Sequence, residues 1–108
     1  MSRPTNGMRP VHPGEILRED FLFPLDMSPN ALAIALRVPA TRIYEIVNEK
    51  RGVTADTAVR LARYFGGDPM SWLNLQAQYD LKVLETHDEI VRSVEPRQES
   101  SEVENAAM

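Results

Sequence analysis

The sequence predicts an all-α protein, a compact bundle of five helices between residues 13 and 85. Apolar residues recur at the three- and four-residue spacing of one helical face, most clearly at Ala58, Leu61, Ala62 and Phe65. Proline and glycine interrupt these patterns at short intervals, and no segment shows the alternation of apolar and polar residues that is typical of a strand. The 108 residues suit one small domain with a modest core.

The first helix is predicted to open at Pro13 and Gly14. Glu15 lies in its first turn, where the helix dipole favours a negative charge. We expect this helix to end near Phe23, because the residue before Pro24 is disfavoured in the α conformation.

The second and third helices have clear boundary signals. Ser28 is an N-cap residue and Pro29 suits the first helical position, which predicts a helix that runs to about Leu36. The next helix is expected to begin near Pro39 and to run to about Asn48.

Two further helices complete the bundle. Thr54 is predicted to cap the fourth helix, which Gly66 and Gly67 end. Asp68 and Pro69 start the fifth, over about residues 70–84.

Residues 28 to 48 have the pattern of a helix-turn-helix unit. Ala33, Leu36, Val38, Ile43 and Ile46 fall at the positions that face inward in such a unit. A small residue is needed at Ala33, where the two helices cross. The second helix of this unit lies in the major groove of DNA, while the first crosses the backbone. The segment therefore predicts binding to double-stranded DNA.

The outward side chains of the third helix are the candidates for reading bases. Arg42 can bond guanine or hold a phosphate, Glu45 can accept from cytosine N4, and Thr41 offers a hydroxyl and a methyl group. Ordinary solvated residues on a short helix are the alternative interpretation. The candidate base-facing residues are Ala40, Thr41, Arg42, Tyr44 and Glu45, and Asn48 at the end of the helix is a further candidate for DNA binding.

Phosphate contacts are expected on either side of this helix. The start of the second helix, with Ser28 and Asn30, is a natural anion site because its amides are unpaired. Lys50 and Arg51 follow the third helix in a turn and can reach a neighbouring phosphate. A solvated turn remains the alternative for these two.

The net charge of −4 at first opposes nucleic-acid binding, which depends on neutralising phosphates. The acidic residues, however, gather at the end of the chain: residues 85–108 carry −5 and residues 1–84 carry +1. Residues 37–63 hold six basic and three acidic side chains. A weakly basic DNA-binding region with an acidic tail fits this distribution, as does a neutral domain with a solubilising tail.

Composition argues against several other classes. Cysteine is absent, so neither disulfides nor thiolate metal sites can form, and we expect a reducing cytoplasmic setting. No apolar run reaches membrane-spanning length, and the first residues do not resemble a secretory signal. His12 and Glu15 lack further metal ligands nearby, and no nucleophile lies beside a base, so we predict no metal, no cofactor and no enzymatic activity.

Three regions are predicted: a flexible arm at residues 1–11, a DNA-binding and dimerisation domain at 12–85, and an acidic, disordered tail at 86–108. A short helix over residues 88–94 of the tail remains open. Apolar residues at the end of the fifth helix lie past the bundle, so we expect a homodimer through Leu81, Val83 and Leu84.

Several blocks together resemble the HigA-type antitoxin family, a branch of the Xre-like helix-turn-helix regulators. The resemblance covers residues 8 to about 85, with the blocks HPGEIL, SPNALAIAL, VPATRIYEIV, RGVTADTAVRLARYFG and WLNLQAQYDL. It implies a lambda-repressor-like five-helix fold. It further implies an antitoxin that neutralises a cognate mRNA-cleaving toxin and, as a dimer, represses its own operon at a palindromic operator. A stand-alone regulator and a protein-interaction module that does not read DNA are the alternatives.

Two positions depart from the broader helix-turn-helix pattern. Arg37 stands where glycine is usual in the turn, which predicts strain if its φ is positive. Pro39 replaces the usual N-cap serine but suits a first helical turn.

Overall fold

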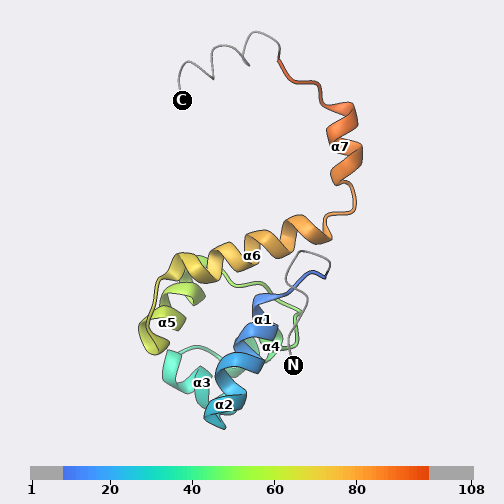
Figure 1. Cartoon of the computed structure of the whole chain (residues 1–108). Coiled ribbons are helices and arrows are strands. Elements are labelled where there is room, and N and C mark those ends of the chain that lie inside the picture. Colours follow the sequence, from blue (N-terminus) through green and yellow to red (C-terminus); the bar gives the residue numbers. More distant parts are fainter. Residues whose placement is uncertain (1–8, 98–108) are drawn as a thin grey trace.

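The structure of the protein is a computed structural model that describes residues 9–97, and every regular element in that range is helical (Figure 1). A strand is absent from the same range. In chain order the elements are α1 (Pro13–Ile16), η1 (Leu17–Leu22), α2 (Phe23–Leu25), α3 (Pro29–Leu36), α4 (Ala40–Val47), α5 (Ala55–Phe65), α6 (Pro69–Val83) and α7 (His87–Ser93). The all-α prediction is confirmed.

The first predicted helix is a continuous run of α1, η1 and α2, and it extends past the expected end. Its middle turn, η1, is π-helical: the N–H of Phe23 donates to the carbonyl of Arg18, five residues back. Pro24 therefore lies inside α2 rather than after the helix. In a regular α-helix the ring of Pro24 would clash with the carbonyl four residues earlier, and the wider π turn relieves that clash. The prediction that Pro24 ends the helix near Phe23 was wrong for this reason.

Helix α3 begins and ends where the sequence predicted. The hydroxyl of Ser28 accepts a hydrogen bond of 3.0 Å from the N–H of Ala31, and Pro29 occupies the first helical position. At the other end Arg37 adopts the left-handed conformation, with φ 63° and ψ 46°. The N–H of Val38 donates to the carbonyl of Ala33 at 3.0 Å, which makes a Schellman end. The strained turn expected at Arg37 is present.

The same helix end recurs twice, without glycine each time. Asp26 and Glu49 both have positive φ, 53° and 63°. The residues that follow, Met27 and Lys50, donate N–H bonds to carbonyls five residues back, at 2.9 and 2.8 Å. Three helical segments thus end on a left-handed residue that carries a side chain, a conformation that glycine adopts more readily.

Helices α4 and α5 begin without a side-chain cap. Pro39 is the N-cap residue of α4 and has no oxygen to offer. Thr54 is the N-cap residue of α5, as predicted, but its side chain makes no capping hydrogen bond. The position of Thr54 was correct, and the expected capping bond is absent.

One apolar core joins all the helices except α2 and α7, whose residues are exposed. Ala33 is 1% exposed and lies where α3 meets α4, as the helix-turn-helix pattern required. The other members of the core come from η1, α3, α4, the α4–α5 loop, α5 and α6: Leu17, Leu22, Leu32, Leu36, Ile43, Ile46, Val47, Val53, Ala58, Leu61 and Trp72.

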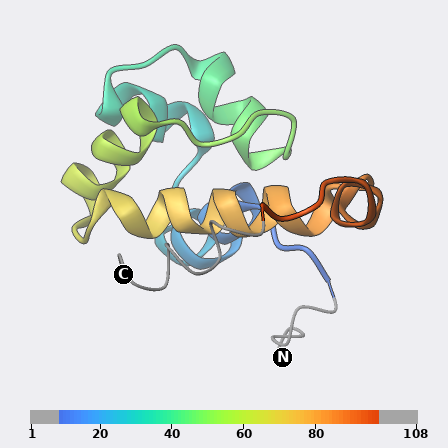
Figure 2. The same cartoon turned by 90° about the horizontal axis from the view of Figure 1, so that it is seen from above.

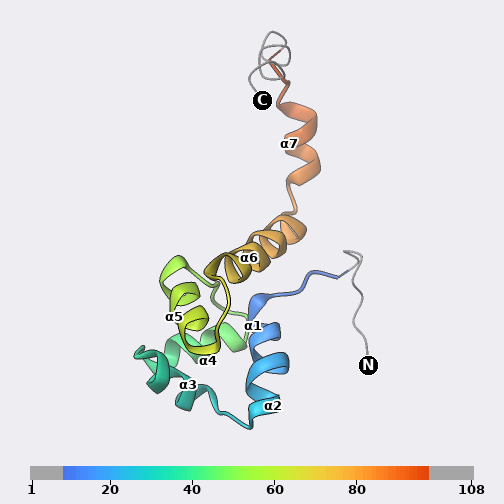
Figure 3. The same ribbon diagram turned by 60° about the vertical axis from the view of Figure 1, so that its left-hand side comes forward.

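Helix α6 spans one side of the bundle and packs on α5 and α1 (Figure 2). It begins at the N-cap Asp68, whose side chain accepts from the N–H of Met70 at 2.9 Å. Helix α7 stands beyond the far end of α6, away from the bundle (Figure 3), and all of its residues are exposed. It occupies the position of the short helix that the sequence left open. Residues 1–8 of the predicted arm and 98–108 of the predicted tail lie outside the described part of the chain.

Candidate nucleic-acid interface

The position of α4 depends on a close approach of α1. Gly14 is buried, and a Cβ atom placed on it would lie 1.7 Å from the carbonyl oxygen of Ile46 in α4. Only glycine lets these two backbones touch. His12, which is 3% exposed, caps α1 because its Nδ1 accepts from the N–H of Gly14 at 2.8 Å. The HPGEIL block thus fixes α4 against the bundle.

The buried His12 also packs edge-on against Tyr79 of α6, with ring centroids 4.8 Å apart. Burial lowers the pKa of His12, partly opposed by the charges of Glu49 and Asp80. The neutral ring can accept the N–H of Gly14, whereas a charged imidazolium carries a proton on both nitrogens and cannot. His12 therefore has a structural role as a helix cap.

The outward face of α4 carries polar side chains at helical spacing. Thr41, Tyr44 and Asn48 are exposed, and Glu45 is half-buried beside them. These four share one face because they are three or four residues apart. Ile43, Ile46 and Val47 are buried on the opposite face. The predicted register of α4 agrees with this burial.

Two of the candidate base-facing residues lie off that outward face. Ala40 is half-buried and packs against the core. Arg42 turns towards α5, where its Nη1 donates to Asp56 Oδ1 at 2.8 Å and contacts Thr57 Oγ1 at 3.5 Å. These partners of Arg42 could not be predicted from the sequence, since they lie fourteen and fifteen residues further along the chain.

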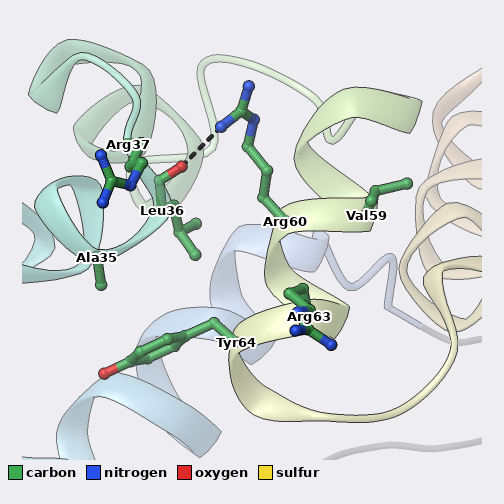
Figure 4. A pocket seen from close by; sticks show the side chains of 7 residues that line it. All are labelled: Ala35, Leu36, Arg37, Val59, Arg60, Arg63 and Tyr64. Atoms are coloured by element: carbon green, nitrogen blue, oxygen red, sulfur yellow. Dashed lines mark hydrogen bonds between the residues drawn. The ribbon is translucent and has the colours of Figure 1, made fainter.

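Asp56 connects Arg42 to a second arginine. Arg60 Nε donates to the same Oδ1 atom at 2.7 Å, and the hydrogen bonds from Arg60 and then Arg42 lower the pKa of Asp56. Arg60 Nη1 also donates to the carbonyl of Leu36 at 2.8 Å, at the end of α3 (Figure 4). This network ties α3, α4 and α5 together beside the outward face of α4.

The turn after α4 contains a paired and an unpaired cation. Arg51 forms a 2.7 Å ion pair with Glu45, so two candidate residues bind each other in the free protein. Lys50 is exposed and has no ion pair within residues 9–97. Of the two, Lys50 is the more available to a phosphate.

The start of α3 offers a smaller anion site than expected. Pro29 has no N–H, and the N–H groups of Ala31 and Leu32 donate to the side chain and the carbonyl of Ser28. Within the described residues, the amide of Asn30 is the one in this turn without an acceptor. Ser28 thus contributes by capping the helix, and the Asn30 amide and side chain are the groups left for an anion.

A hollow of about 480 Å³ lies between α3 and α5, beside the turn at Arg37 (Figure 4). Arg37 and Arg63 line it and have no ion pairs among the described residues. Leu36, Val59 and Tyr64 also line it. The sequence did not indicate this hollow, because its two walls lie far apart along the chain.

The three candidate dimer residues are exposed in the single chain. Leu81, Val83 and Leu84 have exposed fractions of 64, 42 and 43%. Helix α7 adds Ile90 and Val91, 46 and 63% exposed, to the apolar surface at this end. Large apolar side chains so exposed are typical of a surface that a partner covers.

Other kinds of site have little support within residues 9–97. No group of three His, Cys, Asp or Glu side chains there is arranged to hold a metal ion. No helix in the same range is long and apolar enough to cross a membrane. The exposed polar face of α4, held by α1 and α3, defines a helix-turn-helix DNA-binding protein.

Comparison with known proteins identifies the family of this chain. The chain is 56% identical over 91 residues to virulence-associated protein I of Dichelobacter nodosus, with 84% of each covered. It is 40% identical over 74 residues to antitoxin HigA-1 of Vibrio cholerae, covering 68% of this chain and 69% of that protein. No family model matches the chain.

Solved structures give the same result. The Pseudomonas aeruginosa antitoxin HigA with the higBA promoter has a TM-score of 0.78 at 48% identity, covering 82% of this chain and 98% of that one. Antitoxin GraA in complex with its operator has a TM-score of 0.78 at 44% identity, covering 88 and 98%. The chain belongs to the HigA-type antitoxin family of Xre-like helix-turn-helix regulators.

Proposed function

We propose that this protein is the DNA-binding antitoxin of a toxin–antitoxin pair. It neutralises a cognate mRNA-cleaving toxin and, as a homodimer, represses its own operon at a palindromic operator. The observation that carries the proposal is the polar face of α4, fixed by the contact of Gly14 with Ile46, in a family whose solved members include complexes with operator DNA.

The reading residues would be those that share the outward face of α4. Thr41, Tyr44, Glu45 and Asn48 would meet base edges, with Ala40 beside the groove at the start of the helix. Arg42 would leave Asp56 to bind a phosphate or a base edge. Phosphate contacts would come from Asn30 and Lys50 on the two flanks. Ser28 would support Asn30 by capping α3, and Arg51 would leave Glu45 to reach a phosphate.

A homodimer through Leu81, Val83 and Leu84 would place two copies of α4 on one operator. In a two-fold dimer the two reading helices must lie one helical turn of DNA apart, roughly 34–36 Å. The palindromic operator follows from that symmetry.

The proposal also covers the fold type, the domain bounds and the location of the protein. The bundle from α1 to α6 serves as a five-helix, lambda-repressor-like unit, with α1, η1 and α2 counted as one helix. The domain comprises residues 12–85, with an arm at 1–11 and an acidic tail at 86–108 that includes helix α7. The protein acts in the cytoplasm by binding, without a catalytic residue.

A mobility-shift titration with DNA from the promoter of the protein's own gene tests this function. We expect tight binding that weakens steeply as salt rises, and a loss of discrimination against random DNA in Thr41→Ala. Lys50→Ala should weaken binding to both DNAs alike. A chain that binds a toxin partner but no promoter fragment would instead be an interaction module.

A further inference from the structure

Asp56 holds two arginines with one oxygen atom. Its Oδ1 accepts from Arg42 Nη1 at 2.8 Å and from Arg60 Nε at 2.7 Å. Arg42 comes from α4, the reading helix, whereas Asp56 and Arg60 belong to α5. A single carboxylate beside the reading helix therefore neutralises one of the two positive charges next to it.

The two arginines are not equally fixed. Arg60 lies four residues after Asp56 on the same helix, and its Nη1 is also bonded to the carbonyl of Leu36 at 2.8 Å (Figure 4). Among residues 9–97, the one further side-chain hydrogen bond of Arg42 is a long one of 3.5 Å to the hydroxyl of Thr57. Arg42 is thus the partner that can leave Asp56 while the link between α3 and α5 stays in place.

We propose that Asp56 restrains Arg42 and so limits the binding of this protein to DNA of arbitrary sequence. Arg42 exchanges the carboxylate for DNA only when α4 is seated in its operator. The inference rests on the proposed function and deepens it, because it names a residue outside the reading helix that sets the ratio of specific to random binding.

The physical basis is that the Asp56 carboxylate and the DNA phosphates compete for the guanidinium group of Arg42. Non-specific binding to DNA is supplied almost wholly by the neutralisation of phosphates by lysine and arginine. An arginine that is bonded to a carboxylate contributes less to that term, since the carboxylate repels the approaching phosphate. The ion pair must also open, and its partial exposure favours this: Asp56 is 55% and Arg42 27% exposed, and ion pairs open to solvent are weak.

Glu45 and Arg51 show the same arrangement on the other side of α4, with an ion pair of 2.7 Å. Arg42 on α4 and Arg51 in the turn after it therefore both carry a carboxylate partner in the free protein. Lys50 in the same turn has no ion pair among residues 9–97. The two pairings weaken the general attraction of this face for DNA.

Asp56→Asn in the full-length protein tests the proposal, with Asp88→Asn on α7 as the matched control. Asp88 is exposed on α7, a helix that stands apart from the bundle (Figure 1), so its variant has the same net charge but keeps the restraint on Arg42. Dissociation constants are measured for an own-promoter fragment and for a random duplex of equal length, at several salt concentrations.

We expect Asp56→Asn to bind random DNA about eightfold more tightly at ~0.1 M salt, with a salt slope steeper by about 0.9, the values for one additional neutralised phosphate. Binding to the promoter fragment should gain less, so specificity falls. Asp88→Asn should match the wild type, Asp56→Glu should stay close to it, and Arg42→Ala should abolish the effect of Asp56→Asn.

Two results would overturn the proposal. One is unchanged binding of Asp56→Asn to random DNA in a chain that melts like the wild type. The other is a loss of promoter affinity as large as in Arg42→Ala, which would mean that Asp56 orients Arg42 for reading. A wild-type chain that binds no promoter fragment would instead refute the proposed function.

Discussion

Replacing Gly14 by alanine has two opposing effects on the stability of this fold. Gly14 lies in a helix, where alanine is favoured over glycine by about 1 kcal/mol. The contact with α4 opposes this gain, because the new Cβ would lie 1.7 Å from the carbonyl oxygen of Ile46 and 2.8 Å from its carbon. Real Cβ atoms almost never approach closer than 3.0 Å, so α1 and α4 would have to separate by about 1.3 Å.

The clash should outweigh the gain in helix propensity, so we expect Gly14→Ala to lower the free energy of unfolding. Extra atoms in a packed interior destabilise a protein by typically 1–3 kcal/mol, occasionally more, and this clash is with backbone, which no rotamer change relieves. Set against a gain of about 1 kcal/mol, the upper end of that range leaves a net loss of about 2 kcal/mol. For a domain of this size we expect the melting temperature to fall by roughly 8–16 °C.

Urea and thermal unfolding, followed by circular dichroism, measure this difference. Gly52→Ala is the comparison: its Cβ would lie 2.9 Å from the end of the Gln76 side chain, which can shift at the cost of its 2.8 Å hydrogen bond from the N–H of Val53, so the loss of stability should be smaller. Gly14→Ala should also weaken promoter binding in conditions where it stays folded, because the displaced carbonyl belongs to α4. A Gly14→Ala chain as stable as the wild type would refute the packing argument.

Three further changes should have measurable effects. Arg37→Gly should raise the free energy of unfolding by about 0.5–1 kcal/mol, because glycine adopts the left-handed conformation without strain; a lower urea midpoint would contradict this. Since burial lowers the pKa of His12, the unfolded chain binds its proton first, so stability should be constant above about pH 6.5 and fall below it. His12→Asn, which retains a capping acceptor, should weaken that fall in pH-dependent melts, and an identical profile would exclude His12 as its source. Leu81→Glu should shift the protein from dimer to monomer in light scattering, with weaker promoter binding but an unchanged melting curve at low concentration; an unaffected dimer would place the interface elsewhere.

Local signals were enough to predict most helix boundaries. Ser28 and Pro29 mark the start of α3 by chemistry that acts within a few residues, and the three- and four-residue spacing placed Ile43 and Ile46 in the core. The end of the first helix was predicted too early at Pro24, because the wider π turn before it accommodates the proline ring. The sequence pattern has no signal for such a turn.

The candidate site was predictable only in part, because several of its contacts depend on how the helices pack in space. The outward face of α4 follows from its register, so Thr41 and Tyr44 could be placed from the sequence. The ion pair between Arg42 and Asp56 could not, because it depends on how α4 and α5 meet in space. Likewise Gly14 was interpreted as a helix opener, and its contact with Ile46 has no local signal.

The left-handed residues Asp26, Arg37 and Glu49 have a consequence for the lifetime of the protein in a cell. Each holds a conformation that is unfavourable by roughly 1–2 kcal/mol for a residue with a side chain, and each 1.4 kcal/mol raises the unfolded population about tenfold. Proteases act on that unfolded population, so abundance follows it. Substitutions at these exposed positions could lengthen or shorten the half-life of the protein while the core and the outward face of α4 remain unchanged.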